Sequence, residues 1–197
     1  AAGAVGGLAL ELTLALEKGW LTVALSLMVP GIAYVASKRP LPILRHLTTV
    51  LGLLVLARVF WDPRIVGADV GTAPIFNWLL WGYGVPAASF WLAGYILRQR
   101  GEDRATAVAD ALAIFFTGAL LLVEIRHYVT GGNLAYRTTS FTELALDVSA
   151  GFVMSIAIER LRGKIDETVY HVAARLIFGA TLAAALFGLL IAHNPFF

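Results

Sequence analysis

Cysteine is absent from this sequence, and charged residues make up only 14% of its 197 residues. The lack of cysteine excludes disulfides and thiolate chemistry, and the four histidines form no Cys/His cluster for structural zinc. No nucleophile elbow, metalloprotease motif, P-loop or dinucleotide fingerprint occurs either. Soluble domains average about 25% charged residues, so this composition is not that of a soluble domain. We therefore predict no metal, no cofactor and no catalytic residue, and we favour a non-enzymatic role.

Hydrophobic residues, in contrast, make up 59% of the chain. A membrane-spanning helix needs about 20 mostly apolar residues, so the length suffices for about seven spans with short loops. The sequence predicts an all-α fold, a polytopic transmembrane helix bundle that forms a single region over 1–197. Apolar runs place the spans at 1–16, 20–36, 43–61, 75–97, 104–129, 141–159 and 167–192. Pro30 and Pro86 lie inside the second and fourth spans, where the missing N–H predicts kinks.

Basic residues are distributed unevenly among the connections and predict the orientation of the spans. The second, fourth and sixth connections hold nine of the fifteen basic residues, namely Lys38, Arg39, Arg45, Arg98, Arg100, Arg104, Arg160, Arg162 and Lys164. Because cytoplasmic loops carry the excess of lysine and arginine, these connections are predicted to be cytoplasmic. The N-terminus is then predicted to be cytoplasmic and the C-terminus to lie on the outer, periplasmic side. The net charge of +2 thus reflects topology, and we expect no nucleic-acid partner.

Polar residues on the fifth predicted span lie on one face of the helix. This polar seam consists of Thr106, Asp110, Thr117 and Glu124, which are separated by 4, 7 and 7 residues. An ionisable group at the centre of a span costs at least about 2.5 kcal/mol, so each should face the bundle and have a partner. The seam predicts either a proton or ion route, or two acids that pair with neighbouring helices.

Charged residues near the two membrane faces are predicted to form an inner pairing and an outer cluster. On the inner side, Asp110 lies at the depth of His171 and Arg175, which are four residues apart on the seventh span. On the outer side, helix ends bring together Asp62, Asn77, Glu124, Arg126, His127 and Asp147. The histidine could act as a base near neutral pH. However, consecutive helical residues point about 100° apart, so the arginine and histidine of this outer cluster cannot both share the face of Glu124.

Five short elements carry a resemblance to a known family. They are Asp62-Pro63, Phe76-Asn77-Trp78, Tyr83-Gly84-Val85-Pro86, Glu124-Ile125-Arg126-His127 and Gly131-Gly132. Over residues 58–133 the chain resembles a bacterial family of very long predicted membrane proteins, the domain of unknown function numbered twenty-three thirty-nine. The resemblance implies an array of many spans in a bacterial inner membrane. It supports the interpretation of this chain as a fragment of a longer multipass protein. It also supports an internal repeat between 43–63 and 169–195, and it implies no reaction.

These features leave three functions open. We favour an integral membrane helical subunit or scaffold whose periplasm-facing outer cluster binds a partner or a lipid headgroup. One alternative is a transporter or channel-like protein that uses the polar seam. The other is an envelope enzyme that acts on a lipid-linked or glycan substrate at the outer face, with Glu124 and His127 as acid and base. The expected partners are the lipid bilayer and either other membrane subunits or the remainder of a longer chain.

Overall fold

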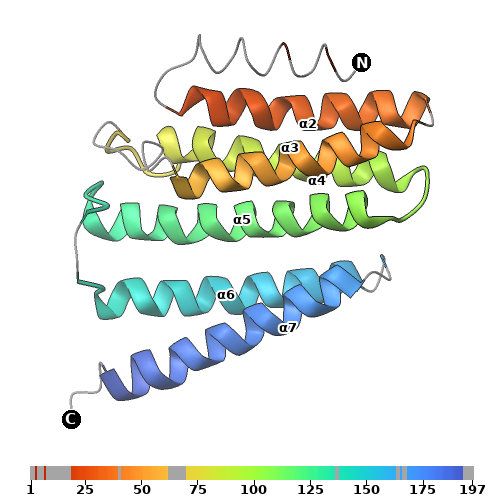
Figure 1. The fold of residues 1–197 in the computed structure, drawn as a ribbon. Coiled ribbons are helices and arrows are strands. Elements are labelled where there is room, and N and C mark those ends of the chain that lie inside the picture. The colour runs from red at the N-terminus through yellow and green to blue at the C-terminus, as the bar shows by residue number, and fades with distance from the viewer. Residues whose placement is uncertain are drawn as a thin grey trace. The chain divides into compact units, whose positions relative to one another are not determined.

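The ordered elements of the computed structural model are all helices, within the residues that it describes (Figure 1). Those residues are 3, 7, 19–39, 41–61, 70–135, 138–162, 165 and 168–192. The elements are α2 (Trp20–Lys38), α3 (Pro42–Trp61), η2 (Leu80–Gly84), α4 (Val85–Arg98), α5 (Arg104–Thr130), α6 (Phe141–Arg162), α7 (Thr168–Ala183) and η3 (Ala184–Ala192). The prediction of an all-α fold is confirmed.

Five of the predicted spans correspond to helices that are long and apolar enough to cross a membrane. These are α2, α3, α5, α6 and the continuous run Thr168–Ala192 formed by α7 and η3. Most of the first predicted span, 1–16, lies outside the described residues, of which it includes only Gly3 and Gly7. The protein is therefore embedded in a membrane, while the predicted total of seven spans and the predicted orientation stay predictions.

The fourth predicted span, 75–97, is divided by a π-helical turn. In η2 the Val85 N–H donates to the Leu80 carbonyl, five residues earlier, and Pro86 lies in the first turn of α4 directly afterwards. Proline has no N–H for the carbonyl four residues before it, so a regular α-helical ladder cannot pass through this point. Such single π turns are a known way to absorb the interruption. Pro30, in contrast, lies inside α2 without ending it.

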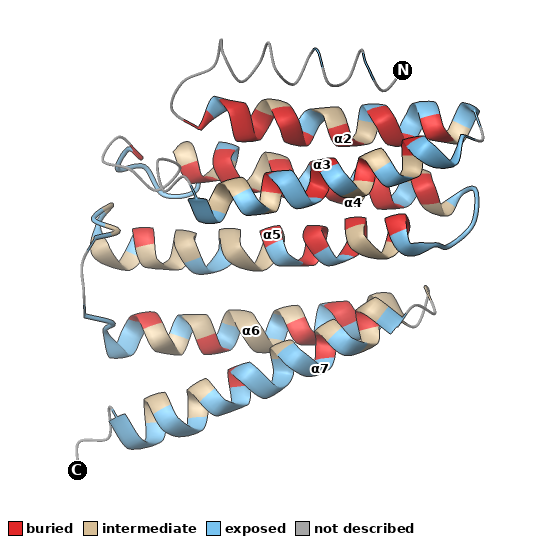
Figure 2. Ribbon diagram, in the orientation of Figure 1, coloured by how far each residue is buried: buried red, intermediate tan, exposed pale blue. Residues whose placement is uncertain are grey.

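The described helices belong to two compact units. Unit 1 comprises 1–71 and 76–117, which include α2, α3, η2, α4 and the first half of α5. In this unit α2 packs against both α3 and α4, and the buried positions gather along their facing sides (Figure 2). Phe90 of α4 stacks on Phe116 of α5 with ring centroids 5.5 Å apart. A Cβ on Gly52 of α3 would lie only 2.8 Å from Leu112, so glycine permits this close approach.

Unit 2 comprises 72–75 and 118–197, with the second half of α5 followed by α6, α7 and η3. Here α6 packs along α7 and η3. Small residues allow the approach, because a Cβ on Gly151 would overlap Thr181 and one on Gly188 would lie 2.5 Å from Leu144. Close contact at small residues is how helices associate in a bilayer, where apolar burial alone gives no preference for protein over lipid.

Candidate functional site

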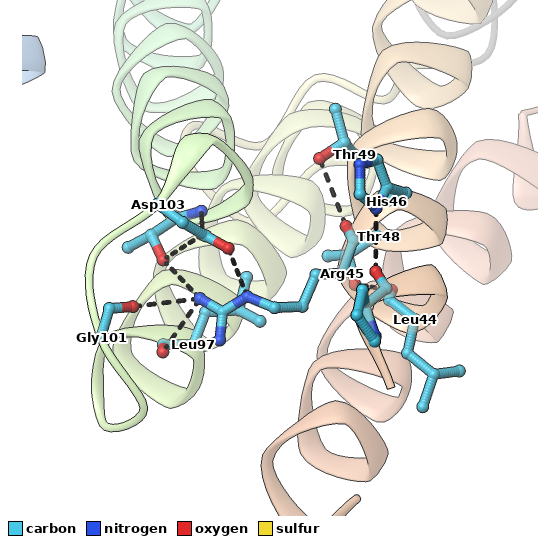
Figure 3. A network of polar contacts seen from close by, with 10 residues as sticks. Leu44, Arg45, His46, Thr48, Thr49, Leu97, Gly101 and Asp103 are labelled. Carbon is cyan, nitrogen blue, oxygen red and sulfur yellow. Dashed lines mark hydrogen bonds and ion pairs between the residues drawn. The ribbon is translucent and has the colours of Figure 1, made fainter. Parts of the chain in front are cut away.

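A polar network in unit 1 joins the start of α3 to the turn between α4 and α5 (Figure 3). Arg45 of α3 reaches across to this turn, where its Nη2 donates to the Gly101 carbonyl at 3.0 Å and to the Thr106 hydroxyl at 3.3 Å. Its Nε lies 2.5 Å from Oδ2 of Asp103. A planar guanidinium can make several such bonds at once, so Arg45 fixes the start of α3 against the turn between α4 and α5.

Asp103 also caps the N-terminus of α5. Its Oδ1 accepts hydrogen bonds from the N–H of Thr106 at 3.0 Å and from the Thr106 hydroxyl at 3.1 Å. Partial burial alone would raise the pKa of Asp103. The hydrogen bonds from Arg45 and Thr106, together with the arginine charge, outweigh this effect and lower the pKa below its ordinary value. Asp103 is therefore the N-cap of α5 and the anion that neutralises Arg45.

The second ion pair of unit 1 lies deeper and joins α4 to α5. Asp110 is completely buried, and its Oδ2 pairs with the guanidinium of Arg98. Gly94 lies one turn before Arg98 on α4, and a Cβ there would overlap Oδ1 of Asp110. Glycine at this position thus makes the room that the buried carboxylate occupies. Arg98 also lies 3.8 Å from the exposed Glu102.

The residues of the polar seam each have partners of their own. Thr106 is fully buried and belongs to the Arg45 network. Thr117 accepts a hydrogen bond from the indole N–H of Trp91 at 3.1 Å and donates to the Ala113 carbonyl. Glu124 lies in unit 2, where its Oε2 accepts the Ile75 N–H at 3.3 Å. The use of the seam as a proton or ion route stays a prediction.

In unit 2 an ion pair joins the end of α5 to the start of α6. Nη1 of Arg126 lies 2.7 Å from Oε1 of Glu143, and its Nε donates to the Leu134 carbonyl at 3.2 Å. The connection turns back at two consecutive glycines with positive φ, Gly131 and Gly132. Only glycine adopts this conformation without strain, which explains why α5 ends here. Sequence reasoning placed Arg126 at this face of the membrane but did not pair it with Glu143.

The Arg126–Glu143 pair has a second acid beside it. Glu143 is 3% exposed, and Asp147 follows four residues later on α6. Oε2 of Glu143 and Oδ1 of Asp147 are both buried, and neither has a hydrogen-bond partner among the described residues. One arginine therefore faces two carboxyl groups that are one helical turn apart.

The residues of the predicted outer cluster belong to different parts of the chain. Asp62 lies outside the described residues. Asn77 belongs to unit 1, where its side-chain oxygen accepts the Leu79 N–H at 2.7 Å. His127, in unit 2, is 1% exposed, whereas the neighbouring Arg126 side chain is 27% exposed. Glu124, Arg126, His127 and Asp147 thus share unit 2, and their joint action as a binding cluster stays a prediction.

For the predicted inner pairing, the structure shows other partners. Asp110 of unit 1 pairs with Arg98, and His171 of unit 2 lies with its Nδ1 3.0 Å from Nη1 of Arg162. Arg175 is exposed on α7. Because Asp110 and Arg175 belong to different units, a pairing between them stays a prediction. Within the described ranges no three His, Asp or Glu residues come together in a group that could hold a metal ion.

Long apolar helices that are joined by buried ion pairs define a multipass helical membrane protein. The chain belongs to the family described as predicted membrane protein (DUF2339), whose family model matches residues 1–197. This finding confirms the resemblance that the sequence motifs indicated. No curated protein and no solved structure matches the chain.

Proposed function

We propose that the protein is a membrane-embedded helical scaffold that packs against another transmembrane helix through α7. The partner helix belongs either to a separate subunit or to a longer form of the same chain. The first support is how the buried charges are used. Arg98 with Asp110 and Arg126 with Glu143 each join two helices, which is a structural role. Because Asp110 already pairs with Arg98, its carboxylate supports an ion route through the seam less well than it supports a structural role.

The observation that carries the proposal is the exposed side of α7. Only 11% of the apolar 18-residue stretch of Thr168–Ala192 is buried, against 50% of the corresponding stretch of α2. Most of this span therefore faces lipid or a partner. Its exposed positions include Gly179, Ala180 and Ala183, and a Cβ on Gly179 would meet nothing within 4 Å in the described part of the chain.

Exposed small residues of this kind favour a partner helix over lipid. A small residue at every fourth position lets a second helix come into close backbone contact, whereas lipid chains gain little from such a surface. Leu176, which is 67% exposed, adjoins the small residues on the same side of α7. We define the α7 face as Leu176, Gly179, Ala180 and Ala183.

Photocrosslinking in native membranes tests this proposal. A photoreactive amino acid replaces Ala183 on the α7 face or, as the matched control, the exposed Ala57 of α3. We expect a protein adduct of one defined mass from position 183 and only lipid adducts from position 57. Lipid adducts alone from both positions would contradict a helix contact at α7.

A second pair of variants tests whether close approach matters. Gly179→Leu fills the open space on the α7 face, and Gly31→Leu does the same on α2, where a Cβ also meets nothing within 4 Å among described residues. We expect Gly179→Leu to abolish the position-183 adduct while Gly31→Leu leaves it intact. If both variants keep the adduct, the α7 face is not the packing surface.

A further inference from the structure

The predicted cytoplasmic end of unit 1 presents a group of exposed cations. Lys38 and Arg39 lie at the end of α2, and Arg100 and Arg104 flank the turn between α4 and α5. All four are exposed, and none forms an ion pair with any described residue. Lys38 lies over the ring of Tyr34, with Nζ 5.5 Å from the ring centroid. We call these four residues the inner basic surface.

The acids near this surface are already engaged by other arginines. Asp103 pairs with Arg45 at 2.5 Å and caps α5, so its charge is satisfied within the fold. Asp110 is buried and pairs with Arg98. Glu102 is exposed and only loosely held, at 3.8 Å from Arg98. The inner basic surface therefore keeps an excess of positive charge that the described residues do not neutralise.

Arg45 holds the two halves of this surface together. It lies in the first turn of α3, shortly after Lys38 and Arg39 in the chain, and it bonds to Gly101 and Asp103 between Arg100 and Arg104 (Figure 3). The start of α3, which follows Lys38 and Arg39, is thus joined to the turn that carries Arg100 and Arg104 by a charged and hydrogen-bonded contact. A ligand would meet positioned turns and would lose less conformational freedom on binding.

Exposed apolar side chains lie on the membrane side of these cations. Tyr34, one turn before the end of α2, is 56% exposed. Ile43 is 61% exposed in the first turn of α3, and Tyr95 is 62% exposed in the last turn of α4. Tyrosine is favoured where the hydrocarbon core meets the headgroups. A ligand that matches both the cations and the exposed apolar side chains has a negative headgroup and an acyl chain, which is the chemistry of an anionic phospholipid.

We propose that the inner basic surface binds anionic phospholipid headgroups of the leaflet that surrounds this end of unit 1. The phosphate is bound by the lysine and arginine side chains, and the acyl chains cover the exposed tyrosines and aliphatic residues. Each lysine or arginine close to an anionic membrane surface strengthens binding roughly fivefold, about 1 kcal/mol. This inference uses residues of α2 to α5 and does not depend on a partner at α7.

Native mass spectrometry of the purified protein tests the proposal. The protein is held in a neutral detergent with equal amounts of phosphatidylglycerol and phosphatidylcholine of identical acyl chains. We expect phosphatidylglycerol to be retained preferentially. Arg100→Gln with Arg104→Gln should reduce that preference roughly 25-fold, which is fivefold for each cation removed. Equal retention of the two lipids by the unchanged protein would overturn the proposal.

Two controls separate a site from a general charge effect. Arg160→Gln with Arg175→Gln removes the same charge at exposed positions of unit 2, and the preference should persist. Glu102→Gln removes the exposed acid beside the surface and should increase the preference, which no loss of folding can imitate. An equal loss in both double variants, or no gain with Glu102→Gln, would contradict a site at the inner basic surface.

A third measurement decides which part of the lipid is recognised. Water-soluble glycerol phosphate is added in excess as a competitor that has the headgroup charge and no acyl chain. We expect it to displace little phosphatidylglycerol, because it cannot cover the exposed apolar side chains. Complete displacement would show a site for soluble anions or acidic protein segments, and the assignment to phospholipid would be wrong.

Discussion

The ion pair between Arg126 and Glu143 allows a prediction in which the two partners are not equivalent. Glu143 is nearly enclosed, with a side chain that is 5% exposed, whereas the Arg126 side chain is 27% exposed. Replacing Arg126 with glutamine leaves a buried carboxylate without its cation. Replacing Glu143 with glutamine leaves an arginine that can extend its head toward water and still has the Leu134 carbonyl within reach.

The burial of each partner sets the expected magnitudes. Removing the cation from a buried pair costs about 3–5 kcal/mol of unfolding free energy. Losing a hydrogen bond to a charged group that can still be solvated costs about 1.5–3 kcal/mol. We therefore expect Arg126→Gln to destabilise the protein more than Glu143→Gln. The double variant should cost less than the sum of the two, with a coupling energy of about 1–3 kcal/mol.

Unfolding by sodium dodecyl sulfate in mixed micelles, followed by far-UV circular dichroism, measures these differences. Tryptophan fluorescence provides an internal comparison, because all five tryptophans lie in unit 1 while the ion pair lies in unit 2. We expect the substitutions to change the unfolding curve followed by dichroism more than the curve followed by tryptophan fluorescence. A greater cost for Glu143→Gln than for Arg126→Gln, or strictly additive effects, would refute the reasoning that burial of the carboxylate sets the cost.

Three further predictions concern single positions. Gly94→Ala should lower the free energy of unfolding, because the new Cβ would overlap Asp110. At Gly31 a new Cβ meets nothing within 4 Å among the described residues, so Gly31→Ala should leave the free energy of unfolding unchanged or raise it by up to about 1 kcal/mol. Unfolding in detergent compares the two variants. Asp147→Asn should raise the unfolding midpoint in the same assay. It removes the charge of a carboxylate whose buried Oδ1 has no hydrogen-bond partner among the described residues. A lower midpoint would contradict this explanation. Asp103 has a folded pKa below its ordinary value of 3.8, so its contribution to stability is complete above that value and is lost as the pH falls through the folded pKa. Asp103→Asn should therefore reduce the loss of stability that a stability–pH profile shows at acid pH. An unchanged loss would show that other carboxyl groups cause it.

Local sequence patterns determined the elements of this fold to a large extent. Apolar runs between charged residues placed five helices close to their observed bounds, because length and composition decide whether a segment can span a bilayer. The consecutive glycines at 131 and 132 marked the end of α5, since both need a positive φ. Pro86 indicated an interruption, although its form, a π turn directly before α4, was not predicted. The short motifs also identified the family correctly.

Partner choice was beyond what the sequence could determine. Depth in the membrane made Arg175 a reasonable partner for Asp110, and that pairing stays a prediction. Within unit 1 the structure pairs Asp110 with Arg98 of the preceding helix. Depth follows from counting residues, but a contact also requires that two helices turn the right faces toward each other. That rotation is set by packing, here by the room that Gly94 leaves for the carboxylate.

The same distinction applies to the remaining charges. Composition and periodicity established a helical membrane protein with acids on one face of α5 and basic residues in alternate connections. Only the tertiary structure decided which charges neutralise one another within a unit, as Arg45 and Asp103 do, and which are left exposed at the inner basic surface. The physical reason is that side-chain pairing depends on distances of a few ångströms between segments far apart in the chain, and no local pattern encodes those distances.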